Sequence, residues 1–531
     1  MIDHARLLVL CSSIALGAGC GDNGTVDRPE VPEDPTIVQL ADGDVQGTLV
    51  GDSRQFAGIP YAKPPVGPLR WKAPQKADPW PDLRAATSFG KRCAQNENVG
   101  LQNKPSADED CLYLNVWTPF PVAAERLPVM VWFHGGGNVN GSASEPVPFL
   151  NTGIFYSGQF LAEKHGVIVV TINYRLGVFG FFAHPELATE GTSGNQGLLD
   201  QLMSLRWVHD NIAAFGGDPN KVTIFGESAG SFDVCMHVAS PMSRGLFHRV
   251  IGESGGCTTK QTTRAEAETA GTNLATAVGC TGTGQLACLR GKAVADLLAA
   301  PGGFGPDVDG SFLPDQPRAL YAAGNVAKVP YLLGSNTDEG TLFLVGSQVA
   351  TPQQYTAALQ MMFPAVATQV EAMYPVASFA NGVPTPALAA LARVFGDARL
   401  VCSTYDTGVR ASANAAVFMY NYDIPVPSTV PGAAFLGATH GSELTSVFGT
   451  SPLLAADTQA KAASDLMQRY WTNFAKTGDP NAGADPKWPA LTANDNVRMN
   501  FAITGPTVKT DFRKTECTFW RGLYDAAFQI P

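Results

Sequence analysis

Short apolar runs alternate with helix-like segments along most of the chain after residue 36. Residues 36–59 read as short strands broken by Asp-Gly and Gly-Asp turns. Leucines and a valine at positions 198, 202, 205 and 208 predict a helix over residues 197–215, and a later helix is expected over 467–476. Six further runs are typical of buried strands, at residues 127–133, 166–172, 221–225, 249–251, 329–333 and 416–419. This alternation predicts an α/β fold, a large and mostly parallel central sheet with helices on both faces.

Two segments, residues 302–318 and 351–400, have mixed patterns that fit neither element. We expect them to be insertions over the active site and to supply the walls of its pocket. The chain has no internal repeat and no domain-sized linker, so residues 36–531 are predicted to form one domain.

The first 35 residues are interpreted separately, as an export signal and a tether. His4 and Arg6 precede an apolar stretch that is too short to span a bilayer. The following Leu16-Gly-Ala-Gly-Cys20 resembles a bacterial lipoprotein signal, with its leucine one residue further from the cysteine than usual. We therefore predict a lipoprotein-like signal over residues 1–19, lipidation of Cys20, and a flexible tether over 20–35. A plain secretory signal, giving a secreted or periplasmic protein, is the alternative.

Composition narrows the possible partners. The chain has 531 residues, and its net charge of −11 argues against nucleic acid and against an anionic membrane surface. Membrane contact is expected only through the N-terminal lipid. Of ten cysteines, eight remain after Cys11 and Cys20 are set aside, an even number that suggests disulfides in an exported protein. No Cys-x-x-Cys pair occurs, so we expect no metal site.

The strongest chemical signal is Gly226-Glu227-Ser228-Ala229-Gly230, which lies between a predicted strand and a predicted helix. Gly-x-Ser-x-Gly in that context is a nucleophile elbow, a tight turn that presents the serine hydroxyl at the end of a sheet. We predict Ser228 as a nucleophile; the alternative is a glycine-rich turn with an incidental serine.

A nucleophilic serine needs a base, and eight histidines compete for that role. His237 follows Ser228 by nine residues in the same predicted helix, about 13 Å away at 1.5 Å per residue, which is too far. His134 is better interpreted as part of the glycine loop that it opens. His440 lies in a loop some distance after a predicted strand, in the chain order Ser, acid, His, and is the predicted base.

The acid and the oxyanion donors are expected at loops that follow strands. Asp338 and Glu339 both fit the acid, and chemistry alone leaves the choice open. An oxyanion hole needs backbone N–H groups that converge on one point. Gly136 and Gly137, in the glycine run after residue 133, and Ala229, which follows the nucleophile, are the candidates.

Many segments of the chain, taken in order, resemble type-B carboxylesterases, the cholinesterase-like branch of the α/β hydrolases. Examples are Pro128-Val-Met-Val-Trp-Phe-His-Gly-Gly-Gly137, the elbow, and Asp338-Glu-Gly340. The resemblance covers residues 36–527, and its other matching segments are residues 56–67, 109–115, 173–180, 211–219, 240–247 and 471–481.

This resemblance implies an α/β-hydrolase fold and several residue roles. Glu339, not Asp338, would be the acid, and Gly136, Gly137 and Ala229 would form the oxyanion hole. Ser254 would be a hydrogen-bonding group beneath the triad, while Glu227 and Glu443 would line the base of the site or, alternatively, be solvated surface carboxylates. Arg70–Glu109 and Arg175–Asp200 resemble the family's structural ion pairs. The family's disulfides map to Cys93–Cys111, Cys280–Cys288 and Cys402–Cys517, and we predict a fourth between the remaining Cys235 and Cys257.

The predicted activity is hydrolysis of small-molecule carboxylic esters through an acyl-enzyme, without a metal or organic cofactor. One departure bears on the substrate: residues 94–110 contain no aromatic side chain, whereas cholinesterases carry there a tryptophan that binds quaternary ammonium. We therefore expect uncharged, hydrophobic esters. The alternatives are a lipase-like enzyme for long-chain esters and a non-catalytic binding module on the same scaffold.

Overall fold

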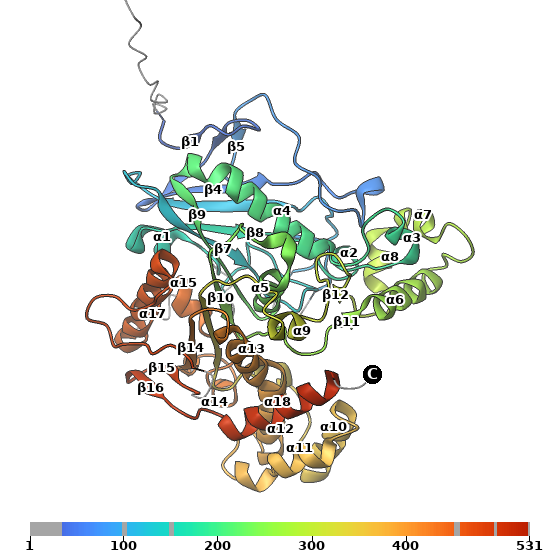
Figure 1. The fold of residues 1–531 in the computed structure, drawn as a ribbon, viewed down its shortest axis with the longest axis vertical. Helices are drawn as coiled ribbons and strands as arrows, with labels where there is room; N and C mark the ends of the chain where they lie inside the picture. The colour runs from blue at the N-terminus through green and yellow to red at the C-terminus, as the bar shows by residue number, and fades with distance from the viewer. Residues whose placement is uncertain (1–33, 98–103, 148–152, 451–456, 493–495, 529–531) are drawn as a thin grey trace, which may run out of the picture. The chain divides into compact units, whose positions relative to one another are not determined.

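The computed structural model describes residues 34–97, 104–147, 153–450, 457–492 and 496–528 (Figure 1). Residues 36–531 form one compact unit. The predicted signal, Cys20 and most of the predicted tether lie outside the described residues. Within the described part of the chain, no helix is long and apolar enough to cross a bilayer.

An eleven-stranded mixed sheet forms the centre of this unit, in the order β16-β15-β14-β13-β10-β9-β7-β8-β6-β4-β3. The strands from β15 to β8 pair in parallel, and the pairs at the two ends of the sheet are antiparallel. The prediction of a mostly parallel sheet therefore holds for its centre. The strands are β3 (Thr48–Val50), β4 (Ser53–Pro60), β6 (Tyr113–Pro119), β7 (Leu127–Phe133), β8 (Ile168–Ile172), β9 (Gly217–Glu227), β10 (Arg249–Glu253), β13 (Tyr331–Asn336), β14 (Val417–Asp423), β15 (Arg498–Ala502) and β16 (Gly505–Lys509).

Successive side chains along the central strands belong alternately to two apolar layers of the core. Val129, Val131 and Phe133 of β7 belong to one buried cluster, and Met130 and Trp132 to the other. Because successive side chains of a strand point to opposite faces, each cluster covers one face of the sheet. Helices α4 (Gln196–Asn211), α5 (Ala229–Ala239) and α13 (Cys402–Ser412) contribute to the first cluster, and α1 (Gln159–His165) and α17 (Thr458–Thr477) to the second.

A third apolar cluster lies away from the sheet and is built around Trp71, Phe182 and Leu289. It joins α2 (Gly177–Gly180), α3 (Pro185–Ala188), α6 (Arg264–Ala277), α7 (Gln285–Arg290) and α8 (Val294–Ala299). Two small sheets complete the strands, one of β1 (Ile37–Val38), β2 (Val45–Gln46) and β5 (Arg84–Ala85), the other of β11 (Thr262–Thr263) and β12 (Asp307–Val308).

The two segments expected as insertions fold differently from each other. Residues 302–318 include β12 and lead into α9 (Pro317–Ala322), and Phe312 of this segment stacks edge-on against His237 of α5. Residues 351–400 form α10 (Pro352–Met362), α11 (Ala367–Met373) and α12 (Pro386–Gly396). Helix α12 passes so close to Gly340 that a Cβ there would lie 1.9 Å from the carbonyl oxygen of Ala392. The second segment thus borders the predicted acid.

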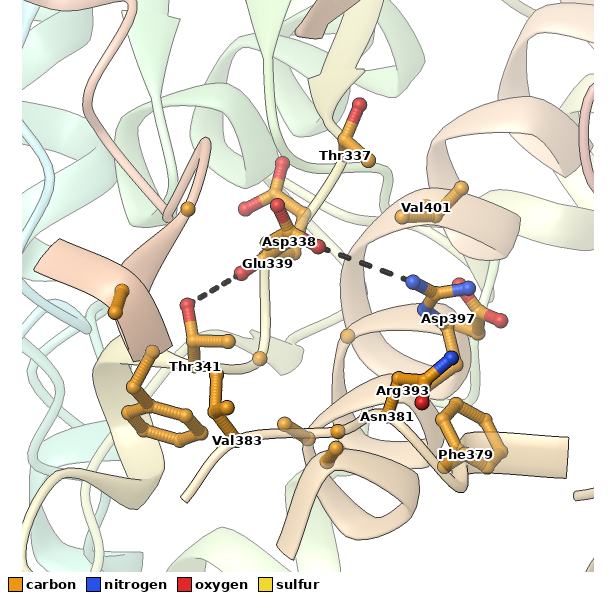
Figure 2. A pocket seen from close by; sticks show the side chains of 18 of the residues that line it. Thr337, Asp338, Glu339, Thr341, Phe379, Asn381, Val383, Arg393, Asp397 and Val401 are labelled. Carbon is orange, nitrogen blue, oxygen red and sulfur yellow. Dashed lines mark hydrogen bonds and ion pairs between the residues drawn. The ribbon is translucent and has the colours of Figure 1, made fainter. Parts of the chain in front are cut away.

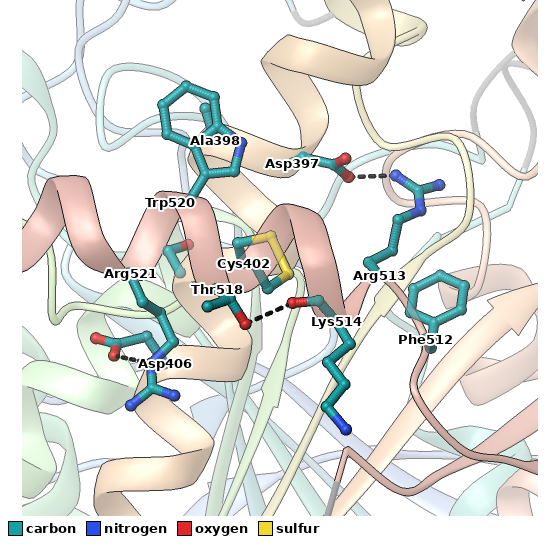
Figure 3. The surroundings of a disulfide bond; sticks show 12 residues. Asp397, Ala398, Cys402, Asp406, Phe512, Arg513, Lys514, Thr518, Trp520 and Arg521 are labelled. Atoms are coloured by element: carbon teal, nitrogen blue, oxygen red, sulfur yellow. Dashed lines mark hydrogen bonds and ion pairs between the residues drawn. A yellow bond between two sulfur atoms is a disulfide. The ribbon is translucent and has the colours of Figure 1, made fainter. Parts of the chain in front are cut away.

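Four disulfides cross-link the described residues, in the four pairings that were predicted: Cys93–Cys111, Cys235–Cys257, Cys280–Cys288 and Cys402–Cys517. The last joins α13 to α18 (Lys514–Phe528), and Figure 3 shows it between two ion pairs, Asp397–Arg513 and Asp406–Arg521. Disulfides are consistent with an exported protein. The predicted structural ion pairs also form, Arg70 with Glu109 and Arg175 with Asp200.

Candidate active site

The predicted nucleophile lies at the turn between β9 and α5. Ser228 has φ 55° and ψ −121°, a backbone conformation that residues other than glycine rarely adopt. Its N–H donates to the carbonyl oxygen of Glu253 at 2.8 Å. The positions on either side of Ser228 must be glycine because neighbouring backbone lies too close for a side chain. A Cβ at Gly230 would lie 2.0 Å from the carbonyl oxygen of Phe133, and a Cβ at Gly226 would lie 2.6 Å from the backbone of Gly230. The sequence between a buried strand and a helix therefore produces the elbow geometry, with Ser228 partly exposed among buried neighbours.

The predicted acid and base meet beyond the ends of β13 and β14. His440 Nδ1 lies 2.6 Å from Glu339 Oε2, and both side chains are buried. The other oxygen of Glu339 accepts the N–H of Asn336, the last residue of β13, at 2.7 Å. Asp338, the alternative acid, instead accepts the N–H of Ala438 at 3.1 Å. Of the two carboxylates, Glu339 is the one in contact with His440.

The second ring nitrogen of His440 faces another carboxylate. Nε2 lies 3.0 Å from Glu227 Oε1, and it makes no hydrogen bond with satisfactory geometry to any described residue. A hydrogen bond between Ser228 and His440 is therefore not formed in this structure, and such contacts commonly tighten only when substrate binds. Burial lowers the pKa of His440, but Glu227 and Glu339 outweigh it and raise the pKa to about 9.

Four buried carboxyl groups influence one another in this region: Glu227 and Glu339, which face His440, and Glu253 and Glu443. Burial, assisted by Glu227, raises the pKa of Glu253 to about 8, and burial with the neighbouring carboxylates raises the pKa of Glu443 well above its usual value. Glu227 and Glu443 are thus buried, not solvated surface groups. Sequence reasoning missed Glu253, although it directly precedes the predicted Ser254. The Trp471 indole donates to its carboxylate at 2.9 Å.

Ser254 lies fully buried beside the elbow with φ 57°. Its backbone N–H donates to the carbonyl oxygen of Gly334 at 2.8 Å. Its hydroxyl has no hydrogen-bond partner among the described residues, so the hydrogen bond expected from this side chain is not present.

The predicted oxyanion loop follows β7 and passes directly beside the elbow. A Cβ at Gly135 would lie 3.1 Å from Ser228 Cβ, so only glycine allows the loop to come this close. Gly136 and Gly137 have φ of 105° and 65°, and the Gly136 carbonyl oxygen accepts the N–H groups of Val139 and Asn140. The loop and Ala229, the first residue of α5, are therefore adjacent to the Ser228 side chain.

An aromatic ring that sequence reasoning did not single out covers the histidine. The Phe343 ring lies 5.0 Å from the His440 ring and 4.9 Å from that of Phe395. Phe343 is 45% exposed, so part of its ring is open to solvent beside the buried histidine. Phe343 lies in residues 342–344, a segment whose sequence has neither strand nor helix periodicity. Sequence reasoning therefore had no pattern by which to identify this residue.

Behind Glu339 lies a cavity of about 250 Å³, shown in Figure 2. Asp338 lines it and lies 3.8 Å from the Arg393 guanidinium of α12, while the Thr341 hydroxyl donates to the Asp338 carbonyl oxygen at 2.7 Å. Phe379 and Val383, from the segment between α11 and α12, form an apolar side. The expected insertion at residues 351–400 thus borders the back of the acid.

Comparison with known proteins agrees with this arrangement. Residues 34–520 match the model of the carboxylesterase family. The chain belongs to that family. It is also 36% identical to a cholinesterase of Mus musculus, over 94% of this chain and 88% of the relative. The resemblance inferred from the sequence is confirmed, and with it the α/β-hydrolase fold and activity as a carboxylic ester hydrolase, whose substrate is a small-molecule ester.

Proposed function

We propose that this esterase works through an acyl-enzyme formed on Ser228, with His440 as general base and Glu339 as the acid that orients it. The observation that carries the proposal is the 2.6 Å contact of Glu339 with His440 Nδ1, next to an elbow that holds Ser228 at positive φ. A carboxylate on Nδ1 selects the tautomer whose Nε2 lone pair can accept a proton.

In the proposed reaction, Ser228 Oγ attacks the ester carbonyl carbon as His440 Nε2 takes the hydroxyl proton. The N–H groups of Gly136, Gly137 and Ala229 stabilise the oxyanion of the tetrahedral intermediate. The C–O bond to the alcohol breaks, and the alcohol leaves with the proton from His440. Water then attacks the acyl-enzyme by the same route, releasing the carboxylic acid and restoring Ser228.

The proposed substrates are uncharged, hydrophobic esters. Residues 94–110 lack an aromatic side chain that could bind a quaternary ammonium group, and the half-exposed Phe343 offers an apolar surface beside the base. Butyrylthiocholine and its uncharged 3,3-dimethylbutyl thioester isostere test this point. We expect no preference for the cationic ester; a strong preference for it would contradict the proposal.

Hydrolysis of p-nitrophenyl esters from acetate to palmitate, by wild type and by Ser228→Ala, tests the mechanism. We expect turnover that is lost in Ser228→Ala, and covalent labelling of wild type alone by a fluorophosphonate. A serine variant with near-normal rates would refute the assignment. The position of the rate maximum along the series separates a carboxylesterase from the lipase-like alternative.

We also propose that the protein is exported as a cell-envelope lipoprotein anchored through Cys20. The support is the sequence of the first 20 residues and the four disulfides, which require an oxidising compartment. Metabolic labelling with a palmitate analogue should mark wild type and not Cys20→Ala. Unlabelled wild type recovered in a soluble fraction would favour the plain secretory signal.

A further inference from the structure

A chain of buried polar side chains runs from the oxyanion loop to the far end of α5. Apolar side chains could fill this space with less desolvation, so the network points to a role for the backbone positions that it fixes. Its members are each less than a tenth exposed: Asn138, Tyr174, Gln201, Asp233, His237 and Ser243.

Asp233 is the centre of this network. Its Oδ1 accepts the Asn138 side-chain amide at 2.9 Å, and its Oδ2 accepts the Gln201 amide of α4 at 2.6 Å. Asn138 directly follows Gly136 and Gly137, whereas Asp233 lies on α5, the helix that begins at Ala229. One carboxylate therefore joins the two backbone segments that carry the proposed oxyanion donors.

The Asn138 end of the network is held at several points. Asn138 has φ 58°, and its carbonyl oxygen accepts the N–H of Gly177 at 2.7 Å. The Tyr174 hydroxyl lies 3.2 Å from Asn138 Oδ1 and donates to the carbonyl oxygen of His134 at 2.6 Å. The left-handed conformation of Asn138 is thus stabilised by bonds from its side chain and its backbone.

The other end of the network fixes the orientation of Gln201. His237 Nε2 lies 3.0 Å from Gln201 Oε1, and His237 Nδ1 lies 2.7 Å from Ser243 Oγ. Burial lowers the pKa of His237 to about 3, so this ring is neutral. Nε2–H then donates to Gln201 Oε1, which leaves the Gln201 amide nitrogen for Asp233.

We propose that Asp233 is a positioning residue for the oxyanion hole, and that its bond to Asn138 keeps the Gly136 and Gly137 N–H groups converging with that of Ala229. This inference rests on the proposed function above. Asp233 does not touch the ester. Its effect should appear where the oxyanion develops, because a small displacement of the loop weakens bonds that form fully only in the transition state.

A reciprocal exchange of the two side chains tests the contact. Asn138→Asp alone sets two carboxyl groups face to face across a 2.9 Å contact and should displace the loop. Combined with Asp233→Asn, the amide and the carboxylate change places: the new amide at 233 can donate to the new carboxylate at 138, and the new amide oxygen at 233 can still accept from Gln201. The double variant preserves net charge, side-chain volume, the contact between positions 138 and 233 and the bond from Gln201, while the Tyr174 hydroxyl keeps its bond to His134.

The readout that distinguishes positioning from folding is binding of a transition-state analogue. A trifluoromethyl ketone adds to the nucleophilic serine and places an oxyanion in the hole, so its inhibition constant reports the donors directly. Burial raises the pKa of Asp233 to about 7, so assays belong at about pH 8, where the carboxylate is ionised. Asp406→Asn is the matched control, because Asp406 of α13 is an equally buried aspartate and pairs with Arg318 of α9, Arg410 of α13 and Arg521 of α18.

For Asn138→Asp we expect kcat/KM and affinity for the trifluoromethyl ketone to fall together by about 10- to 100-fold, part of the roughly 100- to 1000-fold that one lost donor costs. The double variant should recover most of both, and Asp406→Asn should lower neither by more than about twofold. If Asn138→Asp does not fold, Asp233→Asn alone should show a smaller loss of the same kind. Gln201 can accommodate it by turning its amide over while the neutral His237 ring takes its other tautomer, with Nδ1–H donating to Ser243.

Unchanged analogue affinity in folded Asn138→Asp, or no recovery in the double variant, would overturn the inference. Assaying Ser228→Ala in parallel distinguishes failure of this inference from failure of the proposed function. An active Ser228→Ala refutes the serine mechanism itself, whereas an inactive Ser228→Ala with unaffected position-138 and position-233 variants refutes only the role of Asp233.

Discussion

Glu227 Oε1 lies 3.0 Å from His440 Nε2, the nitrogen that must accept the Ser228 proton in the proposed mechanism. Because Glu339 occupies Nδ1, His440 lies between two carboxylates. Both favour the imidazolium, which cannot act as a base. The residue that precedes the nucleophile therefore sets the pH range in which the proposed base is available.

Glu227→Gln should extend activity to lower pH. Burial lowers the pKa of His440, and Glu227 and Glu339 raise it, with a net value of about 9, so kcat/KM of wild type should rise with pH up to that region. Removing one of the two carboxylates should move the midpoint of this rise toward acid by about one unit or more. Glu443→Gln, from the same buried cluster but not in contact with His440 Nε2, is the control. A midpoint that stays in place would show that Glu227 does not govern the base.

Two neighbouring glycines should differ sharply in their tolerance of alanine. A Cβ at Gly136 would lie 2.1 Å from the Asn140 carbonyl oxygen at φ 105°, so Gly136→Ala must displace the loop. We expect kcat to fall at least about 100-fold, as for loss of an oxyanion donor. At Gly137 the nearest atom is 3.7 Å away and φ is 65°, so Gly137→Ala should cost only about 1 kcal/mol of folding stability. Steady-state kinetics and thermal unfolding of the pair check this, and equal losses of kcat would contradict it.

Removal of each disulfide should destabilise the fold in order of loop length. Cys402–Cys517 spans 115 residues and Cys280–Cys288 spans 8. In the chain-entropy model these closures are worth about 5 and about 2.5 kcal/mol. Paired Cys→Ser variants, compared by urea unfolding without reductant, should keep that order. The reverse order would mean that contacts such as Asp397–Arg513 around the longer bridge dominate instead.

The central strands and the elbow could be predicted because their signals are local. Residues 127–133 form β7 with the predicted bounds, since every position from Pro128 onward is buried and β-branched or aromatic residues predominate. The predicted start of the late helix at residue 467 was wrong. Helix α17 begins at Thr458, because the Asp457 side chain caps an exposed first turn that carries no apolar pattern.

Features that depend on distant partners could not be predicted. Strand β15 was missed because it contains Arg498, fully buried between the rings of Tyr405 and Phe512, which only the tertiary fold supplies. Glu253 is buried through a bond to Trp471, 218 residues later. The same holds for the position of His440 between Glu227 and Glu339. The sequence identifies the three side chains, but their orientation depends on how the end of β9 and the loops that carry Glu339 and His440 meet.

Phe343→Ala should weaken binding of long acyl chains more than of short ones. The Phe343 ring lies 5.0 Å from the His440 ring and is 45% exposed, so a substrate chain that covers it gains apolar contact on binding. That contact is equal in the ground state and the transition state, so its loss should raise KM with little change in kcat. Val345→Ala is the matched control, because Val345 is 63% exposed and two residues further along the same segment. For p-nitrophenyl esters from acetate to octanoate, the ratio of variant to wild-type KM should increase with chain length for Phe343→Ala and stay flat for Val345→Ala. Equal ratios at all lengths would place the acyl chain elsewhere.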